Sequence, residues 1–278
     1  MAELETVDVM IPAGAYDLAV GLAREAGAIL RERVATDREI SFKGVVNLVT
    51  DADHASEALI ASRLRETYPD HRLIGEEGAE NVAADDDAPY VWIFDPLDGT
   101  TNYAHGYPHF GVSIALYQRD VPLIGVVYDP MRDECFAAQR GQGATLNDRP
   151  MHVSSIDQLV QSLLATGFSY NLEERAENAA VWNDFLLTTQ GPRRDGAAAL
   201  NLVYVAAGRL DGFWERPLEV WDMAAGGLIV AEAGGTLTNY AGGPFDPFSR
   251  ECVATNGHLH AAMLEVIQRH EPESGDDR

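Results

Sequence analysis

The sequence predicts a mixed α/β (α+β) protein, and three observations support that class. Residues 15–34 and 53–67 carry apolar side chains at helical spacing. Residues 90–139 form short apolar or alternating runs separated by turn residues, which is typical of an antiparallel meander. From Met151 onward, short strands alternate with helices. The first half should therefore combine two helices with a sheet, and the second half should be α/β.

The chain has 278 residues, of which 46% are hydrophobic, so it can bury a substantial core. We find no internal repeat and no flexible linker in the sequence. We expect an amino-terminal half over residues 1–150 and a carboxy-terminal half over residues 151–270, packed tightly against each other. The polar residues 271–278 are expected to be a disordered tail.

The elements of the first half follow from periodicity and turn residues. The helix from Ala15 to Val34 would place Leu18 and Leu22 close to one face. The next helix would begin near Asp53, because a carboxylate is favoured at an N-cap or in a first turn. Strands are expected at residues 72–74, 90–94, 111–117, 123–128 and 134–139.

In the second half, short predicted strands alternate with predicted helices. Its expected strands are residues 162–166, 213–215, 236–238 and 252–254, and residues 192–195 should be a short strand or a loop. Its expected helices are residues 172–187, 196–207, 223–232 and 258–269.

The most informative stretch runs from Trp92 to Asn102. Its apolar run leads to Asp95 and Asp98, and a Gly-Thr-Thr turn follows. Pro96 cannot donate to a strand ladder, so the strand should stop there. Mg2+ prefers hard oxygen ligands such as carboxylate and phosphate oxygens, which suits this stretch to a divalent cation with a phosphate beside it. For the stretch taken alone, an ordinary Asp-Gly turn is an equal alternative.

The formal net charge is −24, and Lys43 is the only lysine beside nineteen arginines. Nucleic acid and anionic membrane surfaces are therefore poor partners, because phosphate neutralisation needs clustered basic residues. The acidity fits life at high salt, where screening reduces self-repulsion. A GC-rich genome that favours Arg over Lys is the other explanation.

The protein is expected to be cytoplasmic. No apolar run approaches the roughly 20 residues of a membrane span. The first ten residues contain Glu3, Glu5 and Asp8, where a signal peptide would have basic residues and then an apolar core. Cys135 and Cys252 lie far apart without metal-ligand spacing, so we expect buried thiols in a reducing compartment.

Carboxylates recur where predicted elements begin or end. They are Asp53, Glu76, Asp95, Asp98 and Asp222. Each one alone is more simply an N-cap or a surface acid. Together they indicate a site, because several carboxylates buried at element ends must pair with cations or be neutralised.

Several segments, in order along the chain, resemble the signature motifs of the inositol monophosphatase family. They are Lys43-Gly44 with residues 47–50 and Asp53, Gly75-Glu76-Glu77, Trp92 to Asn102, Arg193 to Leu200, and Trp221-Asp222 with residues 224–226 and 232–235. The matches span roughly residues 15–267. The resemblance implies the layered α-β-α-β-α sandwich of the inositol monophosphatase and sugar phosphatase type, and a Mg2+-dependent phosphatase.

The resemblance also implies metal ligands. Glu76, Asp95 and the backbone carbonyl of Leu97 would hold one Mg2+. Asp95, Asp98 and Asp222 would hold a second, with Asp95 bridging, and two or three Mg2+ are expected per active site.

The catalytic residues implied by the resemblance are Glu76, Thr100 and Asp53. Glu76 would orient the attacking water with the help of Thr100, whose hydroxyl is held by Asp53. A phosphate monoester is very slow to hydrolyse unaided, and two metals can stabilise both the attacking and the leaving oxygen. A direct attack by water is therefore the expected path.

The substrate contacts are implied in the same way. They are Asp98, Gly99, Thr100 and Asp222 around the phosphate, and Gly196, Ala197, Ala198 and Glu215 facing the hydroxyls of a sugar or polyol. Arg193 would lie near the substrate or at a subunit contact. Ala197 departs from the family, which often has Ser or Thr there.

The expected substrate is a small polyol or sugar phosphate, with inositol 1-phosphate first. Fructose 1,6-bisphosphate, histidinol phosphate and nucleotide 3′-phosphates are the alternatives within the family. A regulatory binding protein that retains the fold is the alternative outside enzymes. By the same resemblance we expect lithium inhibition and a homodimer.

Overall fold

The computed structural model describes residues 9–34, 40–42, 48–79, 88–169 and 171–271. Residues 43–47 of the first motif and residues 272–278 of the expected tail lie outside this described part of the chain.

Two long helices open the chain, α1 (Ala15–Arg33) and α2 (Asp51–Thr67), with the short antiparallel strands β1 (Ile40–Phe42) and β2 (Leu48–Thr50) between them. Helix α2 begins two residues before the expected start near Asp53, and Asp53 takes the first-turn position that was one of its two expected places. Thr50 is the N-cap, and its side chain accepts a hydrogen bond from the N–H of Ala52. Asp53 is the third helical residue and bonds back to Thr50, which completes a capping box.

Seven strands form the first sheet, in the order of the sequence. They are β3 (Arg72–Gly75), β4 (Tyr90–Asp98), β5 (Gly111–Gln118), β6 (Val121–Asp129), β7 (Glu134–Gln139), β8 (Ala144–Leu146) and β9 (Arg149–Met151). From β4 to β9 every pairing is antiparallel, so the predicted meander is confirmed, whereas β3 runs parallel to β4. The three-residue strands β8 and β9 were not predicted, and residue 150, where we divided the chain, lies inside β9.

The predicted end of β4 at Pro96 was wrong. The strand continues to Asp98, and its pairing with β5 shifts register between Asp95 and Asp98. Pro96 lies in this bulge, where a missing N–H costs no ladder hydrogen bond. The short helix α3 (Thr100–Ala104) follows directly.

The second half builds a five-stranded sheet in the order β11-β10-β12-β14-β13. Its strands are β10 (Leu163–Thr166), β11 (Gly191–Arg193), β12 (Gly212–Glu215), β13 (Thr236–Thr238) and β14 (Cys252–Thr255). Its helices are α4 (Leu172–Thr188), α5 (Ala198–Ala206), α6 (Val220–Glu232) and α7 (His260–Gln268), with the 3-10 turns η1 (Leu159–Gln161) and η2 (Pro247–Ser249). Helix α6 begins three residues earlier than predicted, so Asp222 lies inside its first turn.

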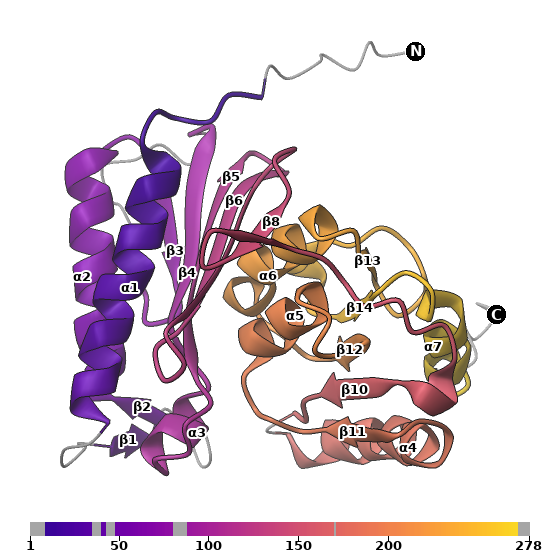
Figure 1. Cartoon of the computed structure of the whole chain (residues 1–278). Helices are drawn as coiled ribbons and strands as arrows, with labels where there is room; N and C mark the ends of the chain where they lie inside the picture. Colours follow the sequence, from indigo (N-terminus) through magenta and orange to yellow (C-terminus); the bar gives the residue numbers. More distant parts are fainter. Residues whose placement is uncertain (1–8, 35–39, 43–47, 80–87, 170, 272–278) are drawn as a thin grey trace, which may run out of the picture.

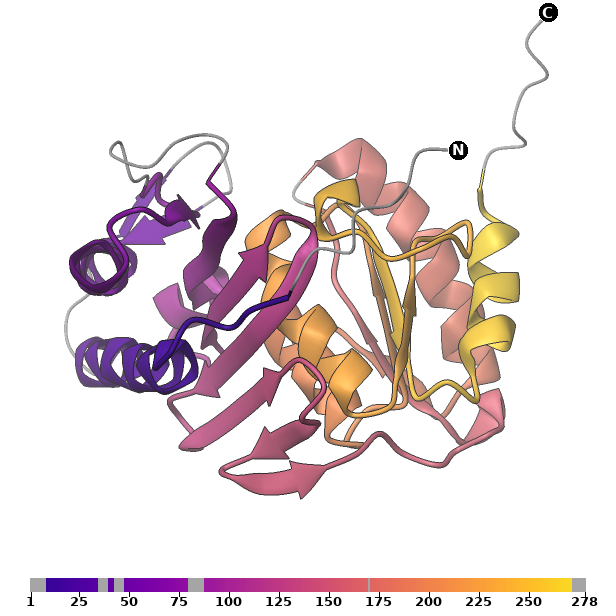
Figure 2. The ribbon, with the colours of Figure 1, turned by 90° about the horizontal axis from the view of Figure 1, so that it is seen from above.

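The elements stack in five layers, and the predicted α-β-α-β-α order is confirmed (Figure 1). Helices α1 and α2 cover the outer face of the seven-stranded sheet, and α5 and α6 lie between the two sheets (Figures 1 and 2). Helices α4 and α7 cover the outer face of the five-stranded sheet (Figure 2). None of the helices in the described ranges is long and apolar enough to cross a membrane.

Helices α5 and α6 join the two halves in one core. Buried side chains of the first sheet, such as Ile93 and Phe136, share a cluster with Leu200 of α5 and Met223 of α6. Helix α6 also approaches the backbone of β6 closely. A Cβ atom on Gly125 would lie 2.5 Å from the carbonyl oxygen of Ala225, so only glycine fits there.

Candidate active site

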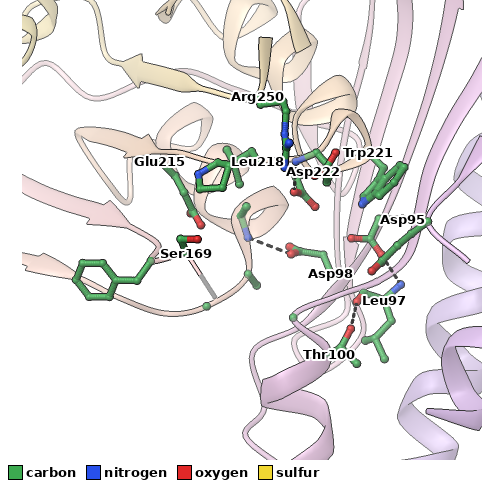
Figure 3. A pocket seen from close by; sticks show the side chains of 18 of the residues that line it. Asp95, Leu97, Asp98, Thr100, Ser169, Glu215, Leu218, Trp221, Asp222 and Arg250 are labelled. Atoms are coloured by element: carbon green, nitrogen blue, oxygen red, sulfur yellow. Dashed lines mark hydrogen bonds and ion pairs between the residues drawn. The ribbon is translucent and has the colours of Figure 1, made fainter. Parts of the chain in front are cut away.

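The bulged end of β4 places two carboxylates at the inner edge of the first sheet. Asp95 is 2% exposed, and its Oδ1 accepts a hydrogen bond from the N–H of Leu97 at 2.8 Å. This local bond holds the chain in the bulge and leaves the other oxygen of Asp95 directed toward Asp222 and Asp98 (Figure 3).

Asp98, at the end of the same strand, caps a helix of the other half. Its two oxygens accept hydrogen bonds from the backbone N–H groups of Ala198 at 3.0 Å, Ala199 at 2.9 Å and Leu200 at 3.4 Å. The N-cap residue of α5, Ala197, makes no side-chain cap of its own. The carboxylate from β4 therefore satisfies the free donors at the start of α5.

Asp222 enters the site from the first turn of α6. Its Oδ2 accepts a hydrogen bond from the N–H of Glu219 at 2.8 Å, and the Glu219 side chain accepts one from the N–H of Asp222. The two residues form a reciprocal capping box. The sequence places both acids at a helix start, where they also suit the helix dipole.

Glu76 reaches the site because β3 runs parallel to β4. Gly75, the last residue of β3, is aligned with Phe94, so Glu76 in the following turn and Asp95 of β4 come to the same edge of the sheet. Glu76 is the second cause, after burial, of the raised pKa of Asp95.

Three of these carboxylates form a tight cluster. Asp95, Asp98 and Asp222 each offer an oxygen within 4.8 Å of the others. The cluster lines a cavity of about 670 Å3 between the two halves (Figure 3). The described residues that line it are Glu76, Asp95, Leu97, Asp98, Gly99, Thr100, Phe168, Ser169, Glu174, Arg194, Gly196, Ala197, Ala198, Glu215, Pro217, Leu218, Glu219, Trp221, Asp222 and Arg250.

Burial and mutual repulsion raise the pKa values of the whole cluster. Burial, then Glu76 and Asp98, hold the pKa of Asp95 well above its usual range. Burial raises the pKa of Asp98 to about 7, although three backbone N–H groups oppose the shift. Burial and then Asp98 raise the pKa of Asp222 well above its usual range. Such a cluster favours a bound cation, which would offset both effects.

The donor set fits a hard divalent cation. Carboxylate oxygens are the ligands that such cations prefer. Each oxygen has two lone pairs, so the single hydrogen bonds to Asp95 and Asp222 leave acceptor capacity for a metal. The carbonyl of Leu97 also faces this region, and it accepts a hydrogen bond from the hydroxyl of Thr100 at 3.1 Å.

The structure brings Thr100 and Asp53 together. The hydroxyl of Thr100 is 3.3 Å from Oδ1 of Asp53, while Oδ2 of Asp53 accepts from the N–H and the hydroxyl of Thr50. Asp53 is fully buried and is not one of the described lining residues, whereas Thr100 lines the cavity. Burial raises the pKa of Asp53 to about 6. Gly99 has φ of 91°, which positions the turn before α3.

The opposite end of the cavity is formed by the second half. Gly196, Ala197, Ala198 and Glu215 line it. Glu215 is half-buried at the end of β12, and burial raises its pKa to about 8 while Arg194 opposes the shift.

Two adjacent arginines differ in position. Arg193, expected near the substrate or at a subunit contact, is not among the described lining residues, and its guanidinium donates to the carbonyls of Gly191 and Pro192. Arg194 lines the cavity instead. Its neighbouring position in the motif was the only signal that could have found it.

Other lining residues were missed by sequence reasoning. Ser169 donates a hydrogen bond to Glu174 at 2.5 Å, and Arg250 pairs with Glu219 at 2.5 Å. Figure 3 shows Ser169 and Arg250 on the side of the cavity opposite Thr100. Ser169 and Arg250 come from loops, and Glu174 comes from the start of α4; none of these segments carries a recognisable motif.

Residues 13–271 match the model of the inositol monophosphatase family. The chain is 43% identical over 253 residues to a protein of Synechocystis sp. named inositol-1-monophosphatase, covering 90% of this chain and 88% of that one. It is 42% identical over 263 residues to a protein of Pseudomonas aeruginosa named Nus factor SuhB, covering 93% and 97%. It superposes on the solved structure of inositol monophosphatase from Anabaena (Nostoc) sp. with a TM-score of 0.83, 42% identity, and coverage of 93% and 97%.

Proposed function

The chain belongs to the inositol monophosphatase family, a family of phosphoric monoester hydrolases, and from that premise we propose that it hydrolyses a small polyol phosphate with Mg2+ as cofactor. Inositol 1-phosphate is the first candidate substrate, because the similar Synechocystis protein is named for it.

The observation that carries this proposal is the cluster of Asp95, Asp98 and Asp222 in a cavity between the two halves. Seven carboxylates and two guanidinium groups belong to the described lining residues. A phosphate ester would be repelled by this excess of negative charge unless divalent cations neutralised it. The same electrostatics argues against a binding protein that works without metal.

We infer that Glu76, Asp95 and the carbonyl of Leu97 hold one Mg2+ and that Asp95, Asp98 and Asp222 hold another. When bound, such cations neutralise charge on the phosphoryl oxygens and acidify water. A third Mg2+ would need further ligands from water or substrate.

The chain's own residues would orient the reactants. Glu76 would accept a hydrogen bond from the attacking water. Thr100, whose hydroxyl lies between Asp53 and the carbonyl of Leu97, would supply a further contact to that water. The backbone N–H groups of Gly99 and Thr100 would bind phosphate oxygens. Positioning of this kind converts an improbable encounter into a near-attack geometry.

The alcohol group of the substrate would lie toward Glu215, Gly196 and Ala198, with Asp98 and Asp222 close to the ester oxygen. A carboxylate such as Glu215 accepts hydrogen bonds from hydroxyl groups, which favours polyols and sugars. Ala197 offers no hydroxyl of its own. The acidic cavity disfavours a second phosphate, so a monophosphate is a better substrate than fructose 1,6-bisphosphate.

A panel assay tests the function. Phosphate release would be measured with Mg2+ and inositol 1-phosphate, fructose 1,6-bisphosphate, histidinol phosphate or a nucleotide 3′-phosphate. Inositol 1-phosphate should have the highest kcat/KM, and Asp95→Asn, which can keep its hydrogen bond to the N–H of Leu97, should reduce it by more than about 100-fold. If none of the four compounds is hydrolysed, the proposal is refuted.

Three further properties belong to the same proposal. Millimolar lithium should inhibit the enzyme, and undiminished activity would contradict the inferred metal arrangement. The chain should form a homodimer, which light scattering after size-exclusion chromatography measures directly. We also expect the protein in the cytoplasm, where fractionation of the source cells would place it.

A further inference from the structure

One face of α2 contacts three parts of the proposed metal site. Asp53, Ser56 and Glu57 occupy positions i, i+3 and i+4, which lie on the same side of a helix. All three are buried, although two are acids and one is polar. Asp53 is bonded to Thr100, as described above. The Ser56 hydroxyl donates to the carbonyl of Pro96, inside the β4 bulge, at 2.9 Å.

Glu57 contacts the third part, the turn that follows Glu76. Its Oε2 accepts a hydrogen bond from the N–H of Glu77 at 2.8 Å, and its Oε1 accepts one from the N–H of Ala79 at 2.9 Å. The side chain is 7% exposed, so both bonds form away from bulk water. Bonds between backbone N–H groups and a carboxylate are stronger than those between neutral groups.

The turn is held from both sides as a result. Before Glu76, strand β3 fixes the backbone by pairing with β4. After Glu76, both anchored N–H groups belong to the next three residues. The contact is close, because a Cβ on Gly75 would lie 2.7 Å from Oε2 of Glu57. Little freedom remains for the backbone that carries the Glu76 side chain.

We propose that Glu57 is a positioning residue that fixes Glu76 at the edge of the carboxylate cluster and thereby sets the affinity of the site for Mg2+. The inference rests on the proposed function, because it takes Glu76 as a ligand of that cation. Residues that orient metal ligands typically contribute 10–100-fold to metal affinity or activity. Glu57 itself touches neither metal nor substrate.

The isosteric variant Glu57→Gln separates positioning from mere support of the fold. Glutamine has one acceptor oxygen, so it can accept only one of the two N–H bonds and must turn its amide N–H2 toward the other donor. The turn after Glu76 would then have to move, because the amide N–H2 of the glutamine and a backbone N–H would point at each other. Burial raises the pKa of Glu57, so removing the charge also removes a desolvation cost. This gain partly offsets the cost of the two facing donors, so metal affinity should fall by much more than the stability of the fold.

The experiment is a titration of the full-length, metal-free protein with Mg2+, followed by calorimetry. We expect the dissociation constant of Glu57→Gln to be about 10–100-fold higher than that of the wild type. The melting temperature in EDTA should fall no further than that of the control variant Asp211→Asn. KM for inositol 1-phosphate at saturating Mg2+ should change much less than the Mg2+ requirement.

Asp211→Asn is the matched control. Asp211 is also a buried carboxylate, 6% exposed, that accepts a backbone N–H, from Leu163 at 2.7 Å, and a hydroxyl, from Ser154. It is not among the described lining residues of the cavity. The control should lose stability without a change in Mg2+ affinity.

A double-mutant cycle with Glu76→Gln completes the test. If Glu57 acts through Glu76, the substitution at residue 57 should have little further effect once Glu76 has been replaced. An unchanged Mg2+ dissociation constant in Glu57→Gln, or fully additive effects in the cycle, would overturn the inference while wild-type phosphatase activity stands. Failure of the wild type to bind Mg2+ would overturn both this inference and the proposed function.

Discussion

The carboxylate of Asp98 accepts a hydrogen bond from the backbone N–H of Ala198 at 3.0 Å, across 100 residues of sequence. One side chain thus caps helix α5 and belongs to the carboxylate cluster. The start of α5 also carries part of the predicted substrate site. Metal binding, the cap and the substrate end of the cavity are therefore physically connected through this carboxylate.

The two aspartates of β4 should differ when each is changed to asparagine. In Asp95→Asn the amide oxygen can still accept from Leu97, whereas in Asp98→Asn the amide N–H2 must face one of the N–H groups of α5. In EDTA, Asp98→Asn should be the less stable variant by about 1–2 kcal/mol. Urea denaturation measures the difference, and equal midpoints would contradict the capping role.

The stabilisation by Mg2+ should increase with pH. The folded-state pKa of Asp98 is about 7 and that of Glu215 about 8, both above unfolded values near 4. A raised folded pKa gives stability that is complete below the unfolded pKa and is lost as pH rises through the folded pKa. The metal-free protein should therefore lose stability progressively between about pH 4 and pH 8, and Mg2+ should restore it. Melting curves recorded with EDTA and with Mg2+ across this pH range test the prediction. A difference in melting temperature between the two conditions that does not change with pH would contradict it.

Glu215→Gln should change substrate preference more than chemistry. Above pH 8, where Glu215 is a carboxylate, loss of this charged acceptor for substrate hydroxyls should raise KM for inositol 1-phosphate by about 10-fold or more. An aryl phosphate without hydroxyl groups should be hydrolysed by the variant at nearly the wild-type rate. Equal losses for both substrates would show that Glu215 acts on the phosphate or the metals instead.

The adjacent arginines provide a matched pair. Arg194 lines the cavity and lowers the raised pKa of Glu215, whereas Arg193 bonds to nearby carbonyls. Arg194→Gln should raise KM for inositol 1-phosphate more than Arg193→Gln does. Steady-state kinetics of both variants decide the point. The opposite order would return Arg193 to the substrate contact that the sequence suggested.

The net charge of −24 predicts a salt response. Screening lengths fall from about 10 Å at 0.1 M to about 3 Å at 1 M salt, which reduces repulsion between surface carboxylates. The melting temperature should rise from dilute buffer to molar NaCl at constant Mg2+. A flat curve would remove the high-salt explanation and leave the composition of the genome as the reason for the missing lysines.

Much of the site was predictable because its acids follow or begin regular elements. Asp95 and Asp98 end an apolar run, and Asp222 precedes a clear helix, so their local positions are readable from the sequence. The distances between these acids cannot be read from the sequence, because the distances depend on how α6 packs on the first sheet. The resemblance to a family supplied that step.

What the sequence could not predict depends on contacts between distant segments. The capping of α5 by Asp98 joins residues 100 positions apart, and the Glu57 bonds to the turn after Glu76 follow no local pattern. The bulge at Pro96 was missed because proline rules allow either a strand end or a bulge. Two neighbouring arginines cannot be distinguished until the course of β11 is known.

The close approach of Gly125 to Ala225 sets how far apart the carboxylates of the proposed metal site lie. Helix α6 carries Asp222, and β4, two strands from β6, carries Asp95, so the depth at which α6 sits on the sheet sets the gap between these acids. That depth is limited by the contact between the backbones of Gly125 and Ala225, and a backbone contact cannot be relieved by a change of side-chain rotamer. The missing methyl group at Gly125 thus sets the distance between helix and sheet. A Gly125→Ala substitution would push α6 away from the sheet and weaken metal binding, although it changes none of the proposed ligands.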